Sequence, residues 1–301
     1  MDIDFVTTYV DMNDLVWQNL YKKTFKCKNI KNIERYRDYG MLKYQLRSIE
    51  KFMPWIRNVI LILQSPSQIP NWLNIKHPKL RIVYHKDYIP KEFLPTFNSN
   101  VIEMFIHNIK DLSENFILAN DDMLAVSPIR EDFFFKNGKP VYKKTIKSKN
   151  FRLLKNGIFD HTLFNNMTLE RKVSKFKNRI QYENKHQMTP YNLSFWKKSI
   201  TRFKNEISQA LTKSPKRNIF NINHWLIRDL ALITNEFIND PERNERGYIS
   251  VNDTVTIEQM LNTIKNSKTA CLNDCFKEKY RGKDIANVLE TILNQKSYFE
   301  V

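Results

Sequence analysis

Two neighbouring carboxylates, Asp121 and Asp122, follow a short apolar stretch at 115–119 (NFILA). A carboxylate pair at the end of a strand suits Mg²⁺ or Mn²⁺, because hard divalent cations prefer oxygen ligands. A cation held there would neutralise the charge of a diphosphate. A solvated turn after the strand is the plainer explanation, and the pair alone does not exclude it.

A second cluster, residues 94–103 (LPTFNSNVIE), places amide and hydroxyl side chains before an expected helix, with Ser99 or Asn100 as its N-cap. The N–H groups of a helix N-terminus, together with such side chains, can bind phosphate or sugar hydroxyls. Glu103 lies one turn further on and could face the same cleft. Ordinary helix capping accounts for the same residues without any ligand.

Two further side chains suit chemistry on a phosphate. His186, in the stretch 185–190 (KHQMTP), could take a proton from an attacking hydroxyl near neutral pH. Arg217 could bind phosphate, because a guanidinium donates two parallel hydrogen bonds and stays charged. Taken singly, each is more simply a surface or packed residue, since the chain has 6 histidines and 49 lysines and arginines.

Several enzyme classes lack support in the sequence. The chain has no P-loop, GxGxxG, HExxH or GxSxG motif, which argues against kinases, Rossmann dehydrogenases, metalloproteases and serine hydrolases. Cys27, Cys271 and Cys275 have no second Cys/His pair at zinc spacing, so we interpret them as reduced thiols. There is neither a membrane-spanning apolar run nor a signal-peptide pattern, and the sequence therefore predicts a cytoplasmic protein.

The elements that must position these residues alternate between strand-like and helix-like patterns. Short apolar or β-branched runs predict strands, and apolar residues at helical spacing predict helices. The strands are expected at 5–10, 58–63, 80–84 and 115–119, and the helices at 38–53, 99–109, 225–237 and 284–293. Such alternation indicates an α/β fold with a largely parallel sheet, whose ligands bind beyond the carboxyl ends of the strands. Asp11, His85 and the Asp121–Asp122 pair are expected there.

The composition changes after residue 138. Residues 139–217 contain 20 lysines and arginines against 4 acidic residues, a net charge of +16, while the whole chain carries +17. A nucleotide-linked substrate, anionic lipid or nucleic acid would explain this concentration, and so would a solvated basic surface. We expect three parts: an α/β core at 1–138, a basic and mainly helical insertion at 139–249, and a C-terminal return to the core at 250–301.

Four blocks in chain order resemble the Stealth family of sugar-1-phosphate transferases. That family includes bacterial capsular and exopolysaccharide phosphotransferases and the lysosomal-enzyme GlcNAc-1-phosphotransferase. The blocks are residues 3–14 (IDFVTTYVDMND), the long series from 35–50 (RYRDYGMLKYQLRSIE) to 120–122, the stretch 185–190 with Arg217, and 271–274 (CLND) with 297–300. Met12 and Tyr9 stand where the family usually has Gly and Trp.

The resemblance implies a glycosyltransferase-A-like core that binds a nucleotide sugar and carries a helical insertion. It also implies a divalent metal, Mg²⁺ or Mn²⁺. It favours His186 as general base, Arg217 as phosphate clamp and Asp122 as a further catalytic residue. Metal and diphosphate binding is expected of Asp121, Asp122, Asn273 and Asp274. The residues expected to contact substrate are Asp4, Asp11, Arg37, Asp38, Arg47, Asn98, Asn100 and Glu103.

The implied reaction moves a hexose-1-phosphate from a UDP-sugar to a hydroxyl of a glycan, giving a phosphodiester and UMP in capsule or cell-surface polysaccharide synthesis. The alternative is an ordinary metal-dependent glycosyltransferase that releases UDP. A nucleic-acid partner is not expected, because no RNA-binding signature accompanies the basic segment. That segment, including 171–177, could also hold the enzyme at the inner face of an anionic membrane, near a lipid-linked acceptor.

Overall fold

The computed structural model describes residues 1–301 except 148–156, 175–180, 184, 213–214, 244–246 and 278. Its central sheet has five strands in the order β10-β4-β1-β2-β3. The strands are β1 (Ile3–Thr8), β2 (Val59–Leu63), β3 (Leu80–Tyr84), β4 (Asn115–Asn120) and β10 (Thr189–Asn192). The first four are parallel, and β10 runs antiparallel at one edge. The predicted α/β fold with a largely parallel sheet is therefore confirmed.

The pairing register makes the parallel strands end together. Thr8 of β1 pairs with Asn120 of β4 and with Ile62 of β2. Leu63, the last residue of β2, pairs with Tyr84, the last residue of β3. The segments that leave these four strands consequently start from one edge of the sheet, which is where an open parallel sheet binds its ligands.

Alternating side chains of each strand enter two separate cores, because successive residues of a strand point to opposite faces. Ile3, Phe5 and Leu61 pack in one core, and Val6 and Ile60 in the other. β2 (VILIL) is buried throughout, as expected for a parallel strand whose two faces are both covered.

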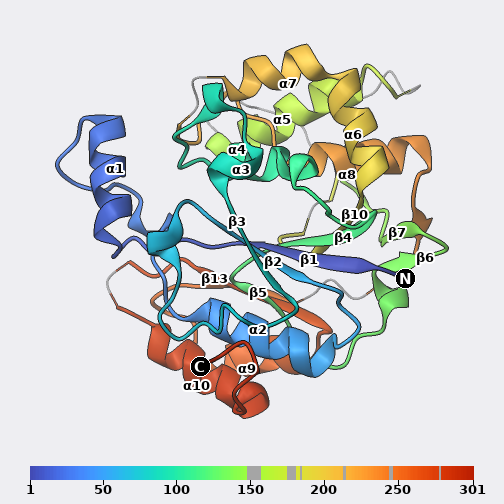
Figure 1. The fold of residues 1–301 in the computed structure, drawn as a ribbon. Helices are drawn as coiled ribbons and strands as arrows, with labels where there is room; N and C mark the ends of the chain where they lie inside the picture. Colours follow the sequence, from blue (N-terminus) through green and yellow to red (C-terminus); the bar gives the residue numbers. More distant parts are fainter. Residues whose placement is uncertain (148–156, 175–180, 184, 213–214, 244–246, 278) are drawn as a thin grey trace.

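The first face is covered by α2 (Met41–Phe52), α9 (Ile257–Lys265) and α10 (Gly282–Leu293), as Figure 1 shows. The helix α2 follows Gly40, whose φ of 88° lies in the left-handed region that favours glycine. A second sheet lies on the same side, with the order β12-β13-β5. It is formed by β12 (Tyr248–Val251), β13 (Thr269–Asp274) and β5 (Met123–Ala125), so the C-terminal part packs directly beside the Asp121–Asp122 turn.

The opposite face carries most of the other helices (Figure 1). They are α3 (His85–Tyr88), α4 (Ser99–Met104), α5 (Ile158–Glu170), α6 (Leu193–Arg202), α7 (Lys204–Leu211) and α8 (Trp225–Thr234). The described part of 139–249 contains the helices α5 to α8, and it also supplies β10 to the central sheet. The buried core on this face contains side chains from β4, α6 and α8 together. The three-part division of the chain stays a prediction.

The remaining elements are short or stand apart from the sheet. The helix α1 (Leu15–Phe25) projects to one side of the core in Figure 1. The other strands are β6 (Phe135–Lys136), β7 (Lys139–Tyr142), β8 (Ile146–Lys147), β9 (Gln181–Tyr182) and β11 (Ile238–Asn239). The 3-10 turns are η1 (Ile33–Arg35), η2 (Pro66–Gln68), η3 (Lys91–Phe93), η4 (Ile106–Asn108) and η5 (Glu131–Phe133). Within the described ranges, no helix is both long and apolar enough to cross a bilayer.

The expected helix at 99–109 differs in two details. It is divided into α4 and the 3-10 turn η4. Its N-cap is Asn98, rather than Ser99 or Asn100, because the Asn98 side chain accepts a hydrogen bond from the Asn100 N–H at 3.1 Å. The cap therefore uses the polar side chain one position before the two that the sequence suggested.

Candidate active site

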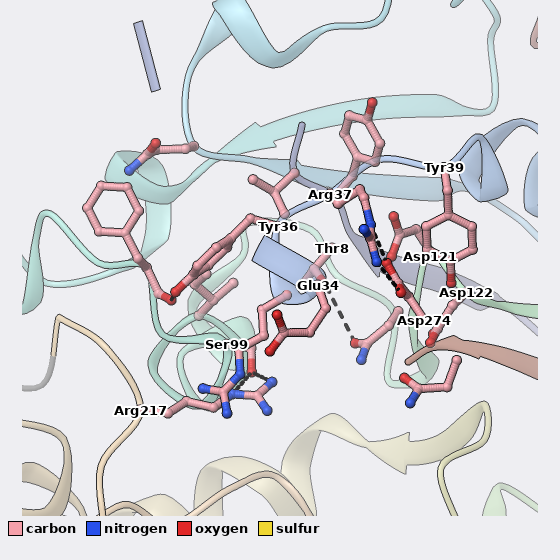
Figure 2. A pocket seen from close by; sticks show the side chains of 18 of the residues that line it. Thr8, Glu34, Tyr36, Arg37, Tyr39, Ser99, Asp121, Asp122, Arg217 and Asp274 are labelled. Atoms are coloured by element: carbon pink, nitrogen blue, oxygen red, sulfur yellow. Dashed lines mark hydrogen bonds and ion pairs between the residues drawn. The ribbon is translucent and has the colours of Figure 1, made fainter. Parts of the chain in front are cut away.

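A pocket of about 400 Å³ opens at the carboxyl ends of the four parallel strands. One side chain at or just after each strand lines it: Thr8, Gln64, His85 and Asn120. Figure 2 shows this pocket, with Asp121 and Asp122 on one side and Ser99 and Arg217 on the other. The predicted location beyond the strand ends is confirmed for His85 and the Asp121–Asp122 pair.

Asp121 and Asp122 form an acidic corner of this pocket. Asp122 is 7% exposed, and its Oδ1 is buried with no hydrogen-bond partner among the described residues. Burial, and then the neighbouring Asp122, raise the pKa of Asp121 well above its usual range. The ion pairs found among described residues place no lysine or arginine at either carboxylate. Because buried negative charge without compensation is unfavourable, this corner fits a divalent cation.

The C-terminal strand β13 brings Asn273 and Asp274 to the same pocket. Both carboxylate oxygens of Asp274 accept from Arg37, Oδ2 from Nε at 2.7 Å and Oδ1 from Nη2 at 2.5 Å. Arg37 also lies over the Phe276 ring, 3.8 Å from its centroid. Both oxygens of Asp274 are thus engaged by Arg37, whereas Asn273 is uncharged and lines the pocket without contacting that guanidinium in the interactions described. The geometry favours Asn273 over Asp274 as a metal ligand.

His186 lies between the acidic corner and β12. Its Nε2 is 3.9 Å from Asp122 Oδ2, and its ring meets Tyr248 edge-on, with the ring centroids 6.1 Å apart. The side chain of His186 is 34% exposed; burial lowers its pKa, and Asp122 acts in the opposite direction. A neutral imidazole beside the pocket can accept a proton.

Arg217 lies across the pocket from Asp121 and Asp122 (Figure 2). Its Nε donates to Ser99 Oγ at 3.0 Å, and its Nη2 donates to the same oxygen (Figure 2). Glu103, which interacts electrostatically with Arg217, is 4% exposed; burial raises the pKa of Glu103 to about 7, and Arg217 acts in the opposite direction. The His224 Nε2 is 3.7 Å from Glu103 Oε2, and burial lowers the pKa of His224 to about 3.

An aromatic cluster forms a further wall of the pocket. Trp17, Tyr36 and Phe97 all line it. The Trp17 ring centroid lies 5.1 Å from that of Tyr36 and 5.3 Å from that of Phe97. Trp17 comes from α1, so the projecting helix contributes to the pocket. Such a wall suits a planar base or the apolar face of a sugar ring.

Two expected substrate residues lie away from the pocket. Asp4 is fully buried near the start of β1, where it accepts from Arg57 Nε at 2.8 Å and Nη2 at 2.6 Å. Arg47 lies on α2 and donates to Glu300 at 2.8 and 2.9 Å, which anchors the C-terminal residues. These ion pairs give both residues a structural role, and the geometry offers no support for donor contact by either.

Four other expected substrate residues surround the pocket without lining it. Asp38 accepts from Tyr9 Oη at 2.8 Å and from the Gly40 N–H at 2.7 Å. Asp11 accepts from the Asn13 N–H at 2.8 Å. Asn98 donates to Asn221 Oδ1 at 2.9 Å, and Asn100 is buried one residue into α4. Each of these residues is adjacent in sequence to one that lines the pocket, whereas Arg37, from the same set, lines the pocket directly.

The sequence interpretation missed three neighbours of these groups. Ser99 orients Arg217, and His224 lies against Glu103. Cys271 is fully buried on β13, with its Sγ 3.4 Å from Asp122 Oδ2. Burial and Asp122 raise the pKa of Cys271 well above its usual range. Its position directly before Leu272-Asn273-Asp274 in the fourth block was the available signal.

Comparison with known proteins decides the family. Residues 35–142 match the model of Stealth protein CR2, conserved region 2. A capsular polysaccharide phosphotransferase of Streptococcus pneumoniae, WcwK, is 35% identical, and the match covers 90% of this chain and 89% of that protein. The chain belongs to the Stealth family. As a member of this family it is a sugar-phosphate transferase.

Other Stealth relatives agree. The exopolysaccharide phosphotransferase cps2G of Lactiplantibacillus plantarum is 31% identical across 99% of this chain and 96% of its own. The capsular polysaccharide phosphotransferase eps5J of Streptococcus thermophilus is 46% identical over 46% of this chain and 59% of that protein. The higher identity to eps5J therefore covers less than half of this chain, whereas cps2G and WcwK match 99% and 90% of it.

Similar solved structures are more distant. An active-site mutant of LgtC aligns over 99% of this chain and 98% of its own, with a TM-score of 0.41 and 10% identity. The bifunctional glycosyltransferase WbbM aligns over 97% of this chain and 50% of its own, with a TM-score of 0.43 and 10% identity. Neither score is high enough to support an inference about fold or activity.

Proposed function

We propose that this Stealth protein transfers a hexose-1-phosphate from a UDP-sugar to a hydroxyl of a capsular or exopolysaccharide glycan. The products are a phosphodiester and UMP. One observation carries the proposal: a single pocket at the strand ends is lined by His186, Arg217 and the Asp121–Asp122 pair. A base, a phosphate-binding guanidinium and a cation site are the parts that phosphoryl transfer requires.

Mg²⁺ or Mn²⁺ fits the acidic corner. Asp121, Asp122 and the side-chain carbonyl of Asn273 would hold it, and the buried, unpartnered Oδ1 of Asp122 supports this assignment. All these atoms are oxygens, which hard cations prefer. When bound, the cation supplies positive charge that offsets the negative charge of the donor diphosphate.

The protein residues carry out the proton transfer and orient the phosphate. His186 accepts the proton of the acceptor hydroxyl, whose oxygen attacks the β-phosphorus of the donor. The bond between the β-phosphorus and the bridging oxygen breaks, and UMP leaves with that oxygen. Arg217, held by Ser99 at 3.0 Å, donates hydrogen bonds to the transferring phosphoryl group. The wall of Trp17, Tyr36 and Phe97 provides an apolar surface for a base or sugar ring.

We also propose a lipid-linked acceptor at an anionic membrane surface, with the enzyme on the cytoplasmic side. The basic segment 139–217 supports this, because each basic residue near such a surface contributes about 1 kcal/mol. Of the stretch 171–177, Lys172 pairs with Glu206 at 2.6 Å, while residues 175–177 lie outside the described part of the chain. Lys197 and Lys198 are exposed on α6, so substituting them tests the membrane contact better than substitutions in 171–177.

The experiment is product analysis with purified protein, Mg²⁺ or Mn²⁺, a panel of UDP-sugars and glycan acceptors. Mass spectrometry and ³¹P NMR should detect UMP and a new phosphodiester. His186→Ala should abolish both, while His161→Ala, on α5 and outside the pocket lining, should retain both. Release of UDP without a phosphodiester would instead establish an ordinary glycosyltransferase, in which the acceptor hydroxyl attacks the anomeric carbon of the sugar.

A further inference from the structure

Three side chains from distant parts of the chain bring different donor atoms together beside the acidic corner. Asp122 Oδ2 lies 3.4 Å from Cys271 Sγ and 3.9 Å from His186 Nε2. One ligand atom from each residue falls within 4.8 Å of the other two. A thiolate, an imidazole and a carboxylate are ligands of zinc and similar metals, whereas Mg²⁺ is bound by oxygen atoms alone.

Two of the three separations are close to those of a tetrahedral zinc site. Bonds from zinc of about 2.3 Å to sulfur and 2.0–2.2 Å to nitrogen or oxygen place sulfur and oxygen roughly 3.5–3.7 Å apart, and nitrogen and oxygen roughly 3.3–3.5 Å apart, at tetrahedral angles. The Cys271–Asp122 distance of 3.4 Å is slightly shorter than the first range, and the His186–Asp122 distance of 3.9 Å is longer than the second. A small rotation of the partly exposed His186 ring would shorten the latter distance.

A second observation also points to a cation. Asp122 is 7% exposed, and its other oxygen, Oδ1, is buried with no hydrogen-bond partner in the part of the chain that the structure describes. Cys271 is 0% exposed, so a bound metal would be shielded from bulk water on that side. His186 and Asp122 also line the pocket, so a metal held by them would lie beside the space that the proposed function assigns to substrate.

We propose that Asp122, His186 and Cys271 form a zinc site that reversibly inhibits the enzyme. Zn²⁺ takes the Nε2 lone pair of His186 and an oxygen of Asp122, and the thiol proton of Cys271 passes to solvent when the metal binds. The inhibitory effect rests on the proposed function, because it requires His186 to act as the base. The binding of zinc itself does not depend on the proposed function. The site is distinct in chemistry from the Mg²⁺ or Mn²⁺ site, although the two share Asp122.

Cobalt provides the direct test, because Co²⁺ replaces Zn²⁺ and reports a bound thiolate through a charge-transfer band in the near ultraviolet. Metal-free full-length protein is titrated with Co²⁺, and Zn²⁺ is then added to displace it. The wild type and the control Cys27→Ser should both show the band and lose it on addition of Zn²⁺. Cys27 belongs to the apolar cluster near α1, away from this triad. Cys271→Ser should show no band.

His186→Ala provides the second variant, since this partly exposed residue can be replaced without opening the core. It should weaken Zn²⁺ binding by about tenfold or more, as even indirect partners of metal ligands contribute that much. Circular dichroism checks that each variant is folded. In the wild type, UMP release in Mg²⁺ should fall by half at the Zn²⁺ concentration that half-saturates the site, and a chelator selective for zinc should restore it.

The proposal of a zinc site would be wrong if the wild type bound Co²⁺ without the thiolate band, or if the band persisted in Cys271→Ser. These readouts do not depend on turnover, so the two proposals can fail separately. A protein that binds zinc through Cys271 but releases no UMP would refute only the phosphotransferase reaction. A protein that releases UMP but does not bind zinc would refute only the zinc site.

Discussion

Glu103 should make the stability of this protein depend on pH in a way that Glu103→Gln removes. Its carboxyl group is buried, with Arg217, His224, Tyr88 and Tyr191 nearby. Burial raises its pKa from 4.5 to about 7. Between these values the folded protein keeps the proton and the unfolded chain releases it. The free energy of unfolding should therefore fall as the pH rises through this window.

The magnitude follows from the shift. Each pKa unit corresponds to about 1.4 kcal/mol, so a shift of about 2.5 units lowers the free energy of unfolding by roughly 3 kcal/mol between pH 4.5 and pH 8. Glutamine has nearly the same shape and does not titrate. The difference in stability between Glu103→Gln and the wild type should consequently change by that amount across the range, in favour of the variant at high pH.

Urea unfolding, followed by tryptophan fluorescence at several pH values from 4.5 to 8, measures this difference. Glu92→Gln is the matched control, because Glu92 is exposed on η3 and should leave the pH dependence of the wild type unchanged. Stability curves for wild type and Glu103→Gln that run parallel over the whole range would refute the reasoning. They would mean that Glu103 is ionised at no cost, for example because Arg217 compensates its charge fully.

The other predictions concern the pocket and the basic surface. Arg217→Ala should lower the rate of UMP release by about 10²–10³-fold. Arg217→Lys should recover only part of that rate, because an ammonium cannot donate the paired hydrogen bonds of a guanidinium. Full activity in the lysine variant would contradict the role of Arg217 in binding the phosphate. Asp122→Asn should raise the Mn²⁺ concentration needed for half-maximal activity, since it removes a charged ligand; an unchanged metal titration would exclude Asp122 as a ligand. The double variant Lys197→Glu, Lys198→Glu should bind less than the wild type to vesicles of anionic lipid in a flotation assay, with vesicles of neutral lipid as the control. If the double variant and the wild type bound anionic vesicles equally, the proposed membrane contact through these lysines would be wrong.

Local patterns predicted the framework of the pocket well. The strands at 58–63 and 80–84 appear as β2 and β3 almost unchanged, because short apolar runs between turns are a local signal. Asp121 and Asp122 could be placed at a strand end for the same reason. The edge strand β10 gave no such signal: its sequence, TPYN, contains Pro190, and it is specified by pairing with β4 rather than by its own composition.

Contacts between distant residues could not be predicted. Arg37 and Asp274 are 237 positions apart, so no spacing rule shows that each neutralises the other. Asp4 lies in a block that resembles the family, but only the fold reveals that it faces Arg57 at the far end of β1. Cys271 was interpreted as an ordinary thiol because no partner lies close to it in sequence, whereas Asp122 is 149 positions away and adjacent in space.

The central claim is that the β-phosphorus of the donor is transferred together with the sugar. The most direct measurement uses a UDP-sugar that carries ³²P in the β-phosphate, incubated with the enzyme, Mg²⁺ or Mn²⁺ and a glycan acceptor, followed by separation of polymer from nucleotide. The account predicts that the label appears in the glycan and that the released nucleotide, UMP, is unlabelled. Label that leaves entirely with UDP, while sugar is added to the glycan, would contradict it.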